Sequence, residues 1–231
     1  MFTCIYCNKK CEYGIPSSFL ITGNEVKKSG ELIQGLPMGL NEIFYDSSRL
    51  DTVIISVHRD SSLGYEWVYP LKSMAESKKQ TFYYRWDWSQ CPESATEDLF
   101  LDLKRILKEN SAIKHVIIFG HSYGGVIIEN LIDDRFGSVE IHSIAAPLSG
   151  YPRLEKECPD YPRFEKIKLI NPFTQWRTRH KQDGAFKHLE ANPQVVPIAG
   201  SSVVQLPDSL NGRRLGHNWS ISWVIDEYFK K

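Results

Sequence analysis

The chain has 231 residues, and its 28 Lys and Arg side chains balance its 28 Asp and Glu side chains, so the formal net charge is zero. A balanced charge gives no indication of a nucleic-acid partner or of an anionic membrane surface. No apolar signal segment follows Met1, and no stretch approaches the roughly 18 apolar residues that a membrane span needs. The sequence therefore predicts no integral membrane segment and, as written, a cytoplasmic protein.

Cysteines are concentrated near the N-terminus, in residues 1–16, which we expect to form an irregular leader before a single domain at 17–231. Cys4, Cys7 and Cys11 have a spacing that suggests zinc ligands, but a structural zinc site also needs a fourth ligand. The favoured interpretation is ordinary reduced cysteines, with no metal bound.

Strand and helix patterns alternate along the rest of the chain. Residues 18–36 contain two runs of alternating apolar residues around a polar centre, which predicts a β-hairpin. The elements expected after it are strands at 52–57, 81–86, 115–119, 139–145, 166–171 and 194–198, and helices at 66–78, 94–109, 124–134 and 217–229. Such alternation predicts an α/β fold with a doubly wound, mostly parallel sheet and helices on both faces.

One of these transitions, from the strand at 115–119 to the helix at 124–134, has the sequence GHSYGG at residues 120–125. A nucleophilic hydroxyl must stand clear of its neighbours, and a strained turn with small residues two positions before and after the serine achieves this. Ser122 is therefore a candidate nucleophile. The backbone N–H of Tyr123, at the start of the helix, is the natural first donor to an oxyanion.

A serine hydroxyl needs a base to take its proton, and the base needs an orienting acid. In a doubly wound fold with the serine on a strand-to-helix turn of this kind, the known order places the acid and then the histidine later in the chain. His217 fits the base best, because it follows a glycine, precedes the last helix and lies near the C-terminus. Asp183, at the tip of the loop HKQDGAF, is the first candidate for the acid, with Asp208 and Asp160 as rivals.

With these residues the chain resembles the α/β-hydrolase superfamily, on its lipase and esterase side, over roughly residues 50–231. The segments that carry the resemblance are the strand ending in Val57-His58, the turn GHSYGG, the segment AAPLSG at 145–150, and Asp183-Gly184 leading to His217. The resemblance implies the α/β-hydrolase fold and a serine hydrolase that cleaves carboxylic esters through an acyl-enzyme. The substrate would be a small-molecule ester or a lipid, and no cofactor would be required.

The sequence departs from such lipases after the early strand, which commonly ends in His-Gly but here reads His58-Arg59-Asp60. By position, the N–H of Asp60 would be the second oxyanion donor, with Ser61 as a substitute. A carboxylate there would disfavour an oxyanion unless Arg59 or solvent offsets it. An acyltransferase or thioesterase on the same fold, or a non-catalytic protein that binds a lipid or peptide, therefore remains an alternative. The oligomeric state is left open.

Overall fold

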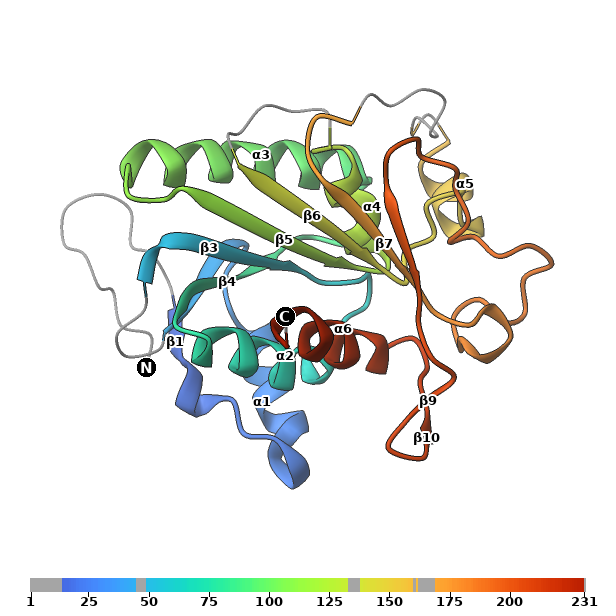
Figure 1. The fold of residues 1–231 in the computed structure, drawn as a ribbon, viewed down its shortest axis with the longest axis horizontal. Helices are drawn as coiled ribbons and strands as arrows, with labels where there is room; N and C mark the ends of the chain where they lie inside the picture. The colour runs from blue at the N-terminus through green and yellow to red at the C-terminus, as the bar shows by residue number, and fades with distance from the viewer. Residues whose placement is uncertain (1–13, 45–48, 133–137, 160, 162–168, 231) are drawn as a thin grey trace.

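The computed structural model of the protein describes residues 14–44, 49–132, 138–159, 161 and 169–230. Within these ranges eight strands form one sheet in the order β1-β2-β4-β3-β5-β6-β7-β8 (Figure 1). The strands are β1 (Gly14–Pro16), β2 (Gly39–Phe44), β3 (Arg49–Val57), β4 (Lys79–Arg85), β5 (His115–His121), β6 (Val139–Ile144), β7 (Phe173–Arg177) and β8 (Ser202–Gln205). Strands β3 to β8 are parallel to one another, whereas β2 pairs antiparallel with β4. The predicted, mostly parallel sheet is confirmed.

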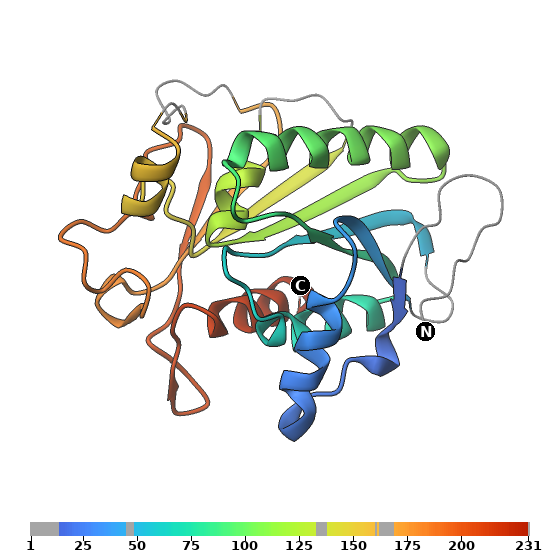
Figure 2. The same cartoon turned by 180° about the vertical axis from the view of Figure 1, so that it is seen from behind.

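Helices cover both faces of the sheet (Figures 1 and 2). One face carries α1 (Val26–Gln34), α2 (Tyr65–Glu76) and α6 (Trp219–Phe229). The other face carries α3 (Pro92–Glu109) and α4 (Tyr123–Glu129), and Leu154 of α5 (Pro152–Glu157) belongs to the core on that side. None of the helices in the described part of the chain combines the length and the apolar character that a membrane span requires.

The central strands are apolar on both sides because both of their faces are covered. Val53, Ile54 and Ile55 of β3 are successive residues and all are completely buried. This burial explains why the run at 52–57 shows no alternation of apolar and polar residues. The register pairs Val57 with Gly120, so the carboxyl ends of β3 and β5 meet at one edge of the sheet.

The predicted hairpin at 18–36 is wrong. The N-terminus does contribute two adjacent strands, but β1 and β2 pair in parallel, and α1 lies between them in the chain. The hairpin prediction places Gly30 in a turn, but Gly30 lies within α1 and has a packing role. A Cβ added to Gly30 would lie 2.5 Å from the backbone nitrogen of Tyr65. The bare backbone of Gly30 thus lets α1 pack closely against the start of α2.

Two later strands also differ from prediction. The expected strand at 166–171 lies partly outside the described residues, its last three residues are irregular, and the sheet instead continues with β7. The expected strand at 194–198 is irregular as well, and β8 follows it. Val196 and Ile198 are buried against the core from a loop, so their apolar character reflects burial and not strand pairing.

The leader prediction is wrong for its last three residues, because Gly14–Pro16 forms β1 and joins the sheet. Residues 1–13, which include Cys4, Cys7 and Cys11, lie outside the described residues. The prediction of a single domain from residue 17 stays a prediction.

Candidate active site

Ser122 lies between the end of β5 and the start of α4, in a strained backbone conformation with φ 54° and ψ −118°. Left-handed φ values are costly for a residue with a side chain, and they persist only where the surroundings impose them. The Ser122 N–H donates to the carbonyl of Ile144 at 2.8 Å, and its own carbonyl accepts from the N–H of Gly125 at 2.9 Å. The turn is therefore held from both the neighbouring strand and the helix that follows.

The glycines around Ser122 are required by close backbone contacts. A Cβ on Gly120 would lie 2.5 Å from the carbonyl oxygen of Gly124, and a Cβ on Gly124 would lie 2.3 Å from that of Val57. Both distances are too short for any side chain. The small residues therefore let the turn close on itself and against the carboxyl end of β3.

Asp183 and His217 form a hydrogen-bonded pair. The Nδ1–H of His217 donates to Oδ2 of Asp183 at 3.0 Å, and the carboxylate is completely buried. The hydroxyl of Thr178 donates to the same oxygen, and the N–H of Ala185 donates to Oδ1 at 2.8 Å. Burial by itself would raise the pKa of Asp183, but these hydrogen bonds and the charge of His217 hold the pKa below its ordinary value. The carboxylate is thus ionised at neutral pH, and its hydrogen bond to Nδ1 fixes the orientation of the His217 ring.

His121 connects this pair to the serine turn. It precedes Ser122, is completely buried, and donates its Nε2–H to the carbonyl of His217 at 3.1 Å. Burial lowers the pKa of His121 well below its ordinary value, so the ring is a neutral donor. The rings of His121 and His217 lie 4.6 Å apart, and the ring of Phe186 contacts His217 edge-on at 5.0 Å. The loop carrying His217 is therefore fixed against the residue that immediately precedes Ser122.

The two other aspartates considered, and His180 on the same loop as Asp183, have other partners or lie outside the described residues. Asp208 is exposed and pairs with Nε of Arg179 at 2.8 Å. His180 donates from Nε2 to the carbonyl of Phe186 at 2.9 Å. Asp160 lies outside the described residues. Of the two candidate aspartates that the structure describes, Asp183 is the one that lies against His217.

The segment after β3 is fixed by Trp86. His58 is fully buried, which lowers its pKa to about 3, and its Nδ1–H donates to the carbonyl of Arg59 at 2.7 Å. The Nε1–H of Trp86 donates to the carbonyl of His58 at 2.8 Å, and the backbone N–H of Trp86 donates to Nε2 of His58 at 3.3 Å. The ring of Trp86 also stacks on that of Tyr123, with centroids 5.2 Å apart. Trp86 thus holds the end of β3 beside the serine turn.

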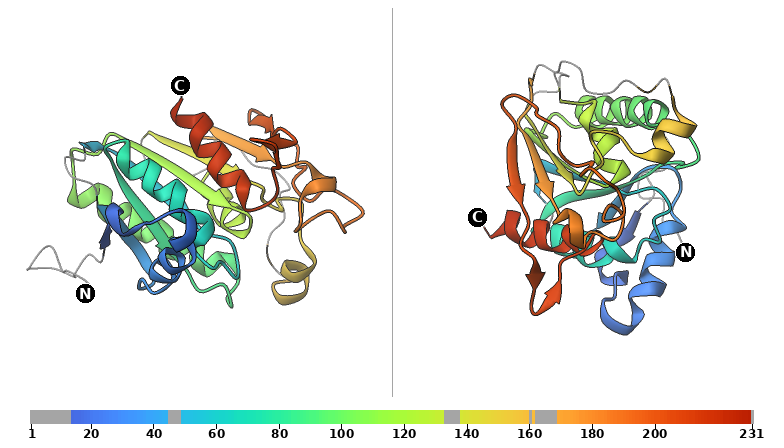
Figure 3. Two further views of the ribbon diagram at one scale, coloured as in Figure 1. Left: turned by 90° about the horizontal axis from the view of Figure 1, so that it is seen from below. Right: turned by 90° about the vertical axis from the view of Figure 1, so that its right-hand side faces the viewer.

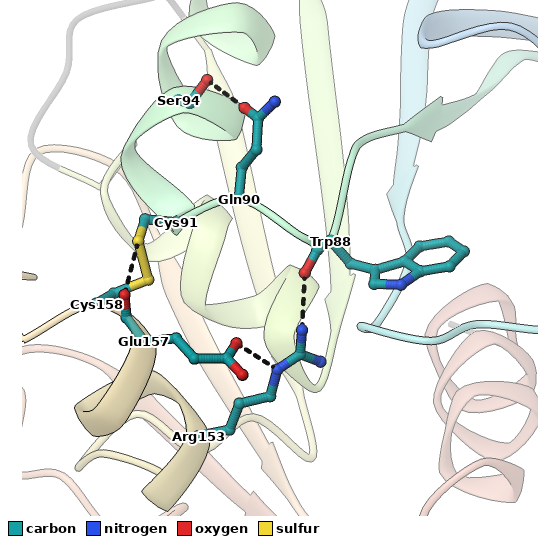
Figure 4. Close-up of a disulfide and its surroundings, with 7 residues drawn as sticks. All are labelled: Trp88, Gln90, Cys91, Ser94, Arg153, Glu157 and Cys158. Atoms are coloured by element: carbon teal, nitrogen blue, oxygen red, sulfur yellow. Dashed lines mark hydrogen bonds and ion pairs between the residues drawn. A yellow bond between two sulfur atoms is a disulfide. The ribbon is translucent and has the colours of Figure 1, made fainter.

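The carboxylate of Asp60 is paired with an arginine from α5. Nη1 of Arg153 donates to Oδ2 of Asp60 at 2.9 Å, so the negative charge is offset. The same guanidinium donates from Nη2 to the carbonyl of Trp88 at 3.1 Å and from Nε to Glu157 at 2.7 Å (Figure 4). Arg59, which sequence reasoning considered for this role, donates instead to the carbonyl oxygen of Asp60 at 2.8 Å.

A disulfide between Cys91 and Cys158 fixes α5 in place (Figure 4). Cys91 immediately precedes α3 and Cys158 immediately follows α5, and the two lie 67 positions apart in sequence. Disulfides persist chiefly in oxidising compartments. The cytoplasmic prediction stays a prediction, and this disulfide weighs against it.

Sequence reasoning missed four residues that fix this site: Trp86, His121, Arg153 and Thr178. Each acts on a residue distant in the chain except Thr178, which precedes Asp183 by five positions. A buried threonine just after a strand is not a distinctive sequence pattern. Nothing in the sequence around Trp86, His121 or Arg153 indicates the distant partners that they bind. Within the described residues, no group of His, Cys, Asp or Glu side chains is arranged to hold a metal ion.

The sequence matches no family model and no curated protein, but the structure matches solved ones. Est1E from Butyrivibrio proteoclasticus superposes with a TM-score of 0.57 at 11% identity, covering 83% of this chain and 90% of that one. XC6422 from Xanthomonas campestris, described as an α/β serine hydrolase without a lid, gives 0.51 at 10% identity, covering 83% and 92%. The Pyrococcus furiosus esterase Pf2001 gives 0.52 at 13% identity, covering 91% and 94%. The chain has the α/β-hydrolase fold.

Proposed function

We propose that the protein is a serine hydrolase that cleaves carboxylic esters through an acyl-enzyme. The observation that carries the proposal is the Asp183–His217 pair, which His121 ties to the strained turn of Ser122. Nucleophile, base and orienting acid are the three parts that such chemistry needs. The substrate class is a small-molecule ester or a lipid.

In the proposed reaction, Oγ of Ser122 attacks the ester carbonyl while Nε2 of His217 takes the hydroxyl proton. The Asp183 carboxylate holds the imidazole orientation and stabilises the imidazolium that forms. The imidazolium then gives its proton to the departing alcohol oxygen as the bond from carbonyl carbon to that oxygen breaks. Water, deprotonated by His217, attacks the acyl carbonyl, and the imidazolium returns the proton to Oγ of Ser122 as the bond from the carbonyl carbon to Oγ breaks and the acid leaves.

We assign the oxyanion to the backbone N–H groups of Tyr123 and Asp60. Tyr123 is the first residue of α4, where N–H groups lack acceptors within the helix and the helix dipole favours negative charge. The ion pair of Asp60 with Arg153 supports the second assignment, because it offsets the charge that would oppose an oxyanion there. This pairing addresses the departure of His58-Arg59-Asp60 from the His-Gly pattern.

The neighbouring structures support the same reaction class. Pf2001 is named an esterase in its own description, and XC6422 is named a serine hydrolase. At 10–13% identity these likenesses bear on the fold, and the reaction rests on the geometry around Ser122.

The test is hydrolysis of 4-nitrophenyl esters of increasing acyl length by the purified protein and by Ser122→Ala. Removing the nucleophile should lower kcat on the order of 10⁴–10⁶-fold. Ser94→Ala, on an exposed part of α3, is the matched control and should keep full activity. Equal turnover by Ser122→Ala, with a native circular dichroism spectrum, would end the proposal.

A further inference from the structure

An open hollow of about 570 Å³ lies directly against His217. Its walls come from the loop after Asp183, from the segment that leads into His217, from the start of α6 and from the segment after β3. The residues that line it are Arg59, Gly184, Ala185, Arg213, Arg214, Gly216, His217, Asn218 and Trp219. Three of these are arginines, and the lining contains no carboxylate side chain.

Two of the arginines stand on a short hairpin that holds them in position. Strands β9 (Ser209–Leu210) and β10 (Arg213–Arg214) pair antiparallel, and the turn between them is Asn211-Gly212. Both turn residues have positive φ, 51° and 73°, as a tight two-residue hairpin turn requires. The hairpin projects beside the N-terminal end of α6 (Figures 1 and 3). Buried Leu215, whose N–H donates to the carbonyl of Asp208 at 3.0 Å, anchors the segment that continues to His217.

The positive charge of the hairpin is not offset within the described part of the chain. Arg213 and Arg214 are exposed and make no ion pair with a described carboxylate; Arg213 lies over the ring of Trp219 at 5.3 Å. Arg59 is partly offset, since its Nε lies 3.5 Å from Glu66.

Three aspartates on segments that form or adjoin this hollow already have partners. Asp183 is bound to His217, Asp208 pairs with Arg179, and Asp60 pairs with Arg153. The hollow is therefore cationic, with one exposed aromatic ring in its wall. Guanidinium groups bind carboxylates and phosphates with directed hydrogen bonds, and the ring of Trp219 offers a flat apolar contact.

We infer that this hollow binds the alcohol half of the ester, and that this half carries a carboxylate or a phosphate. The inference rests on the proposed function, in which His217 delivers a proton to the leaving alcohol. That alcohol must lie next to His217, and His217 lines the same hollow as Arg213 and Arg214.

The test compares esters that differ in where a negative charge lies. The substrates are 4-nitrophenyl butyrate (neutral), 3-carboxy-4-nitrophenyl butyrate (anionic alcohol half) and mono-4-nitrophenyl glutarate (anionic acyl half). The proteins are the wild type, Arg213→Gln/Arg214→Gln, and Lys104→Gln/Lys108→Gln. The lysine double variant is the control. It removes two exposed positive charges from α3, which lies on the opposite face of the sheet from α6.

The readout is the ratio of kcat/KM for an anionic ester to kcat/KM for the neutral ester, since intrinsic reactivity cancels between proteins. The arginine double variant should lower this ratio about tenfold for the anionic alcohol, as two exposed charges acting together allow. The lysine double variant should leave the ratio unchanged. About 0.5 M salt should reduce the wild-type ratio, because exposed charges are screened at that ionic strength.

Inhibition of neutral-ester turnover distinguishes the two anions. 3-Hydroxybenzoate carries a carboxylate and phenyl phosphate carries a phosphate. The stronger inhibitor of the two indicates which anion the hollow prefers, provided that its inhibition is weaker in the arginine variant. An unchanged ratio in the arginine variant, or a ratio that falls only for the glutarate ester, would overturn the inference while leaving the hydrolase proposal intact. Absence of turnover with all three esters would instead count against the proposed function.

Discussion

Loss of the disulfide between Cys91 and Cys158 should destabilise the protein by an amount that follows from the chain it closes. The bond closes a loop of 67 residues. The chain-entropy relation for such a loop gives about 4 kcal/mol in the free energy of unfolding. For a chain of this size, each kcal/mol shifts Tm by about 2–4 °C, so the expected loss in Tm is roughly 8–16 °C.

The assay is calorimetric or fluorescence-monitored unfolding of the wild type with and without a phosphine reductant. Cys91→Ala/Cys158→Ala is measured in the same way, and peptide mass mapping verifies the cross-link. The variant keeps Cys4, Cys7 and Cys11, so any effect of the reductant on those cysteines appears in both proteins. The wild type should lose stability on reduction. The variant should have a low Tm without reductant, and the reductant should not change it. A shift below about 2 °C on full reduction, or an equal shift in the variant, would refute this reasoning.

Three further predictions concern the site. Asp183→Asn should lower kcat by roughly 10²–10⁴-fold with little change in KM, whereas Asp208→Asn should cost less than about tenfold; steady-state kinetics that show the large loss only in Asp208→Asn would transfer the role of the acid. Arg153→Ala should lower kcat about tenfold by leaving the carboxylate of Asp60 unpaired, and the loss should shrink when Asp60→Asn is added; an equal loss in both backgrounds would mean that Arg153 acts only on the fold. Burial lowers the pKa of His58 from 6.5 to about 3, so the unfolded chain binds the extra proton first and stability falls as the pH drops from 6.5 towards 3. Denaturant titrations should show about 2 kcal/mol of this loss between pH 7 and pH 5, and His58→Gln should lack it; an identical pH dependence in both proteins would contradict the assignment.

Elements buried on both faces of the sheet could be predicted from the sequence, whereas those that depend on distant packing could not. The run at 52–57 is apolar throughout and became the central strand β3. The segment 18–36 alternates like a strand, but its helix depends on Gly30 meeting the backbone of α2, about 35 residues away. The run at 194–198 is apolar because it covers the core as a loop, which periodicity does not distinguish from a strand.

The candidate site shows the same division. The residues that would carry out the reaction have distinctive neighbours, such as the glycines around Ser122 and the Asp-Gly at residue 183, so their positions could be predicted. The residues that hold them in place have no such neighbours: Trp86 and Arg153 act through partners 28 and 93 positions away. The pairing of Cys91 with Cys158 is of this kind too, because connectivity among five cysteines cannot be deduced from sequence.

Labelling by a fluorophosphonate probe tests the central claim most directly, because it requires an activated serine and no knowledge of the substrate. The probe reacts with a serine whose proton a neighbouring base removes. The wild type should be labelled at Ser122 and at no other residue, as mass mapping of the modified peptide would show. His217→Ala should react far more slowly, and Ser122→Ala should not react. A folded wild type that stays unlabelled, or one labelled elsewhere, would contradict the assignment of Ser122 as the nucleophile.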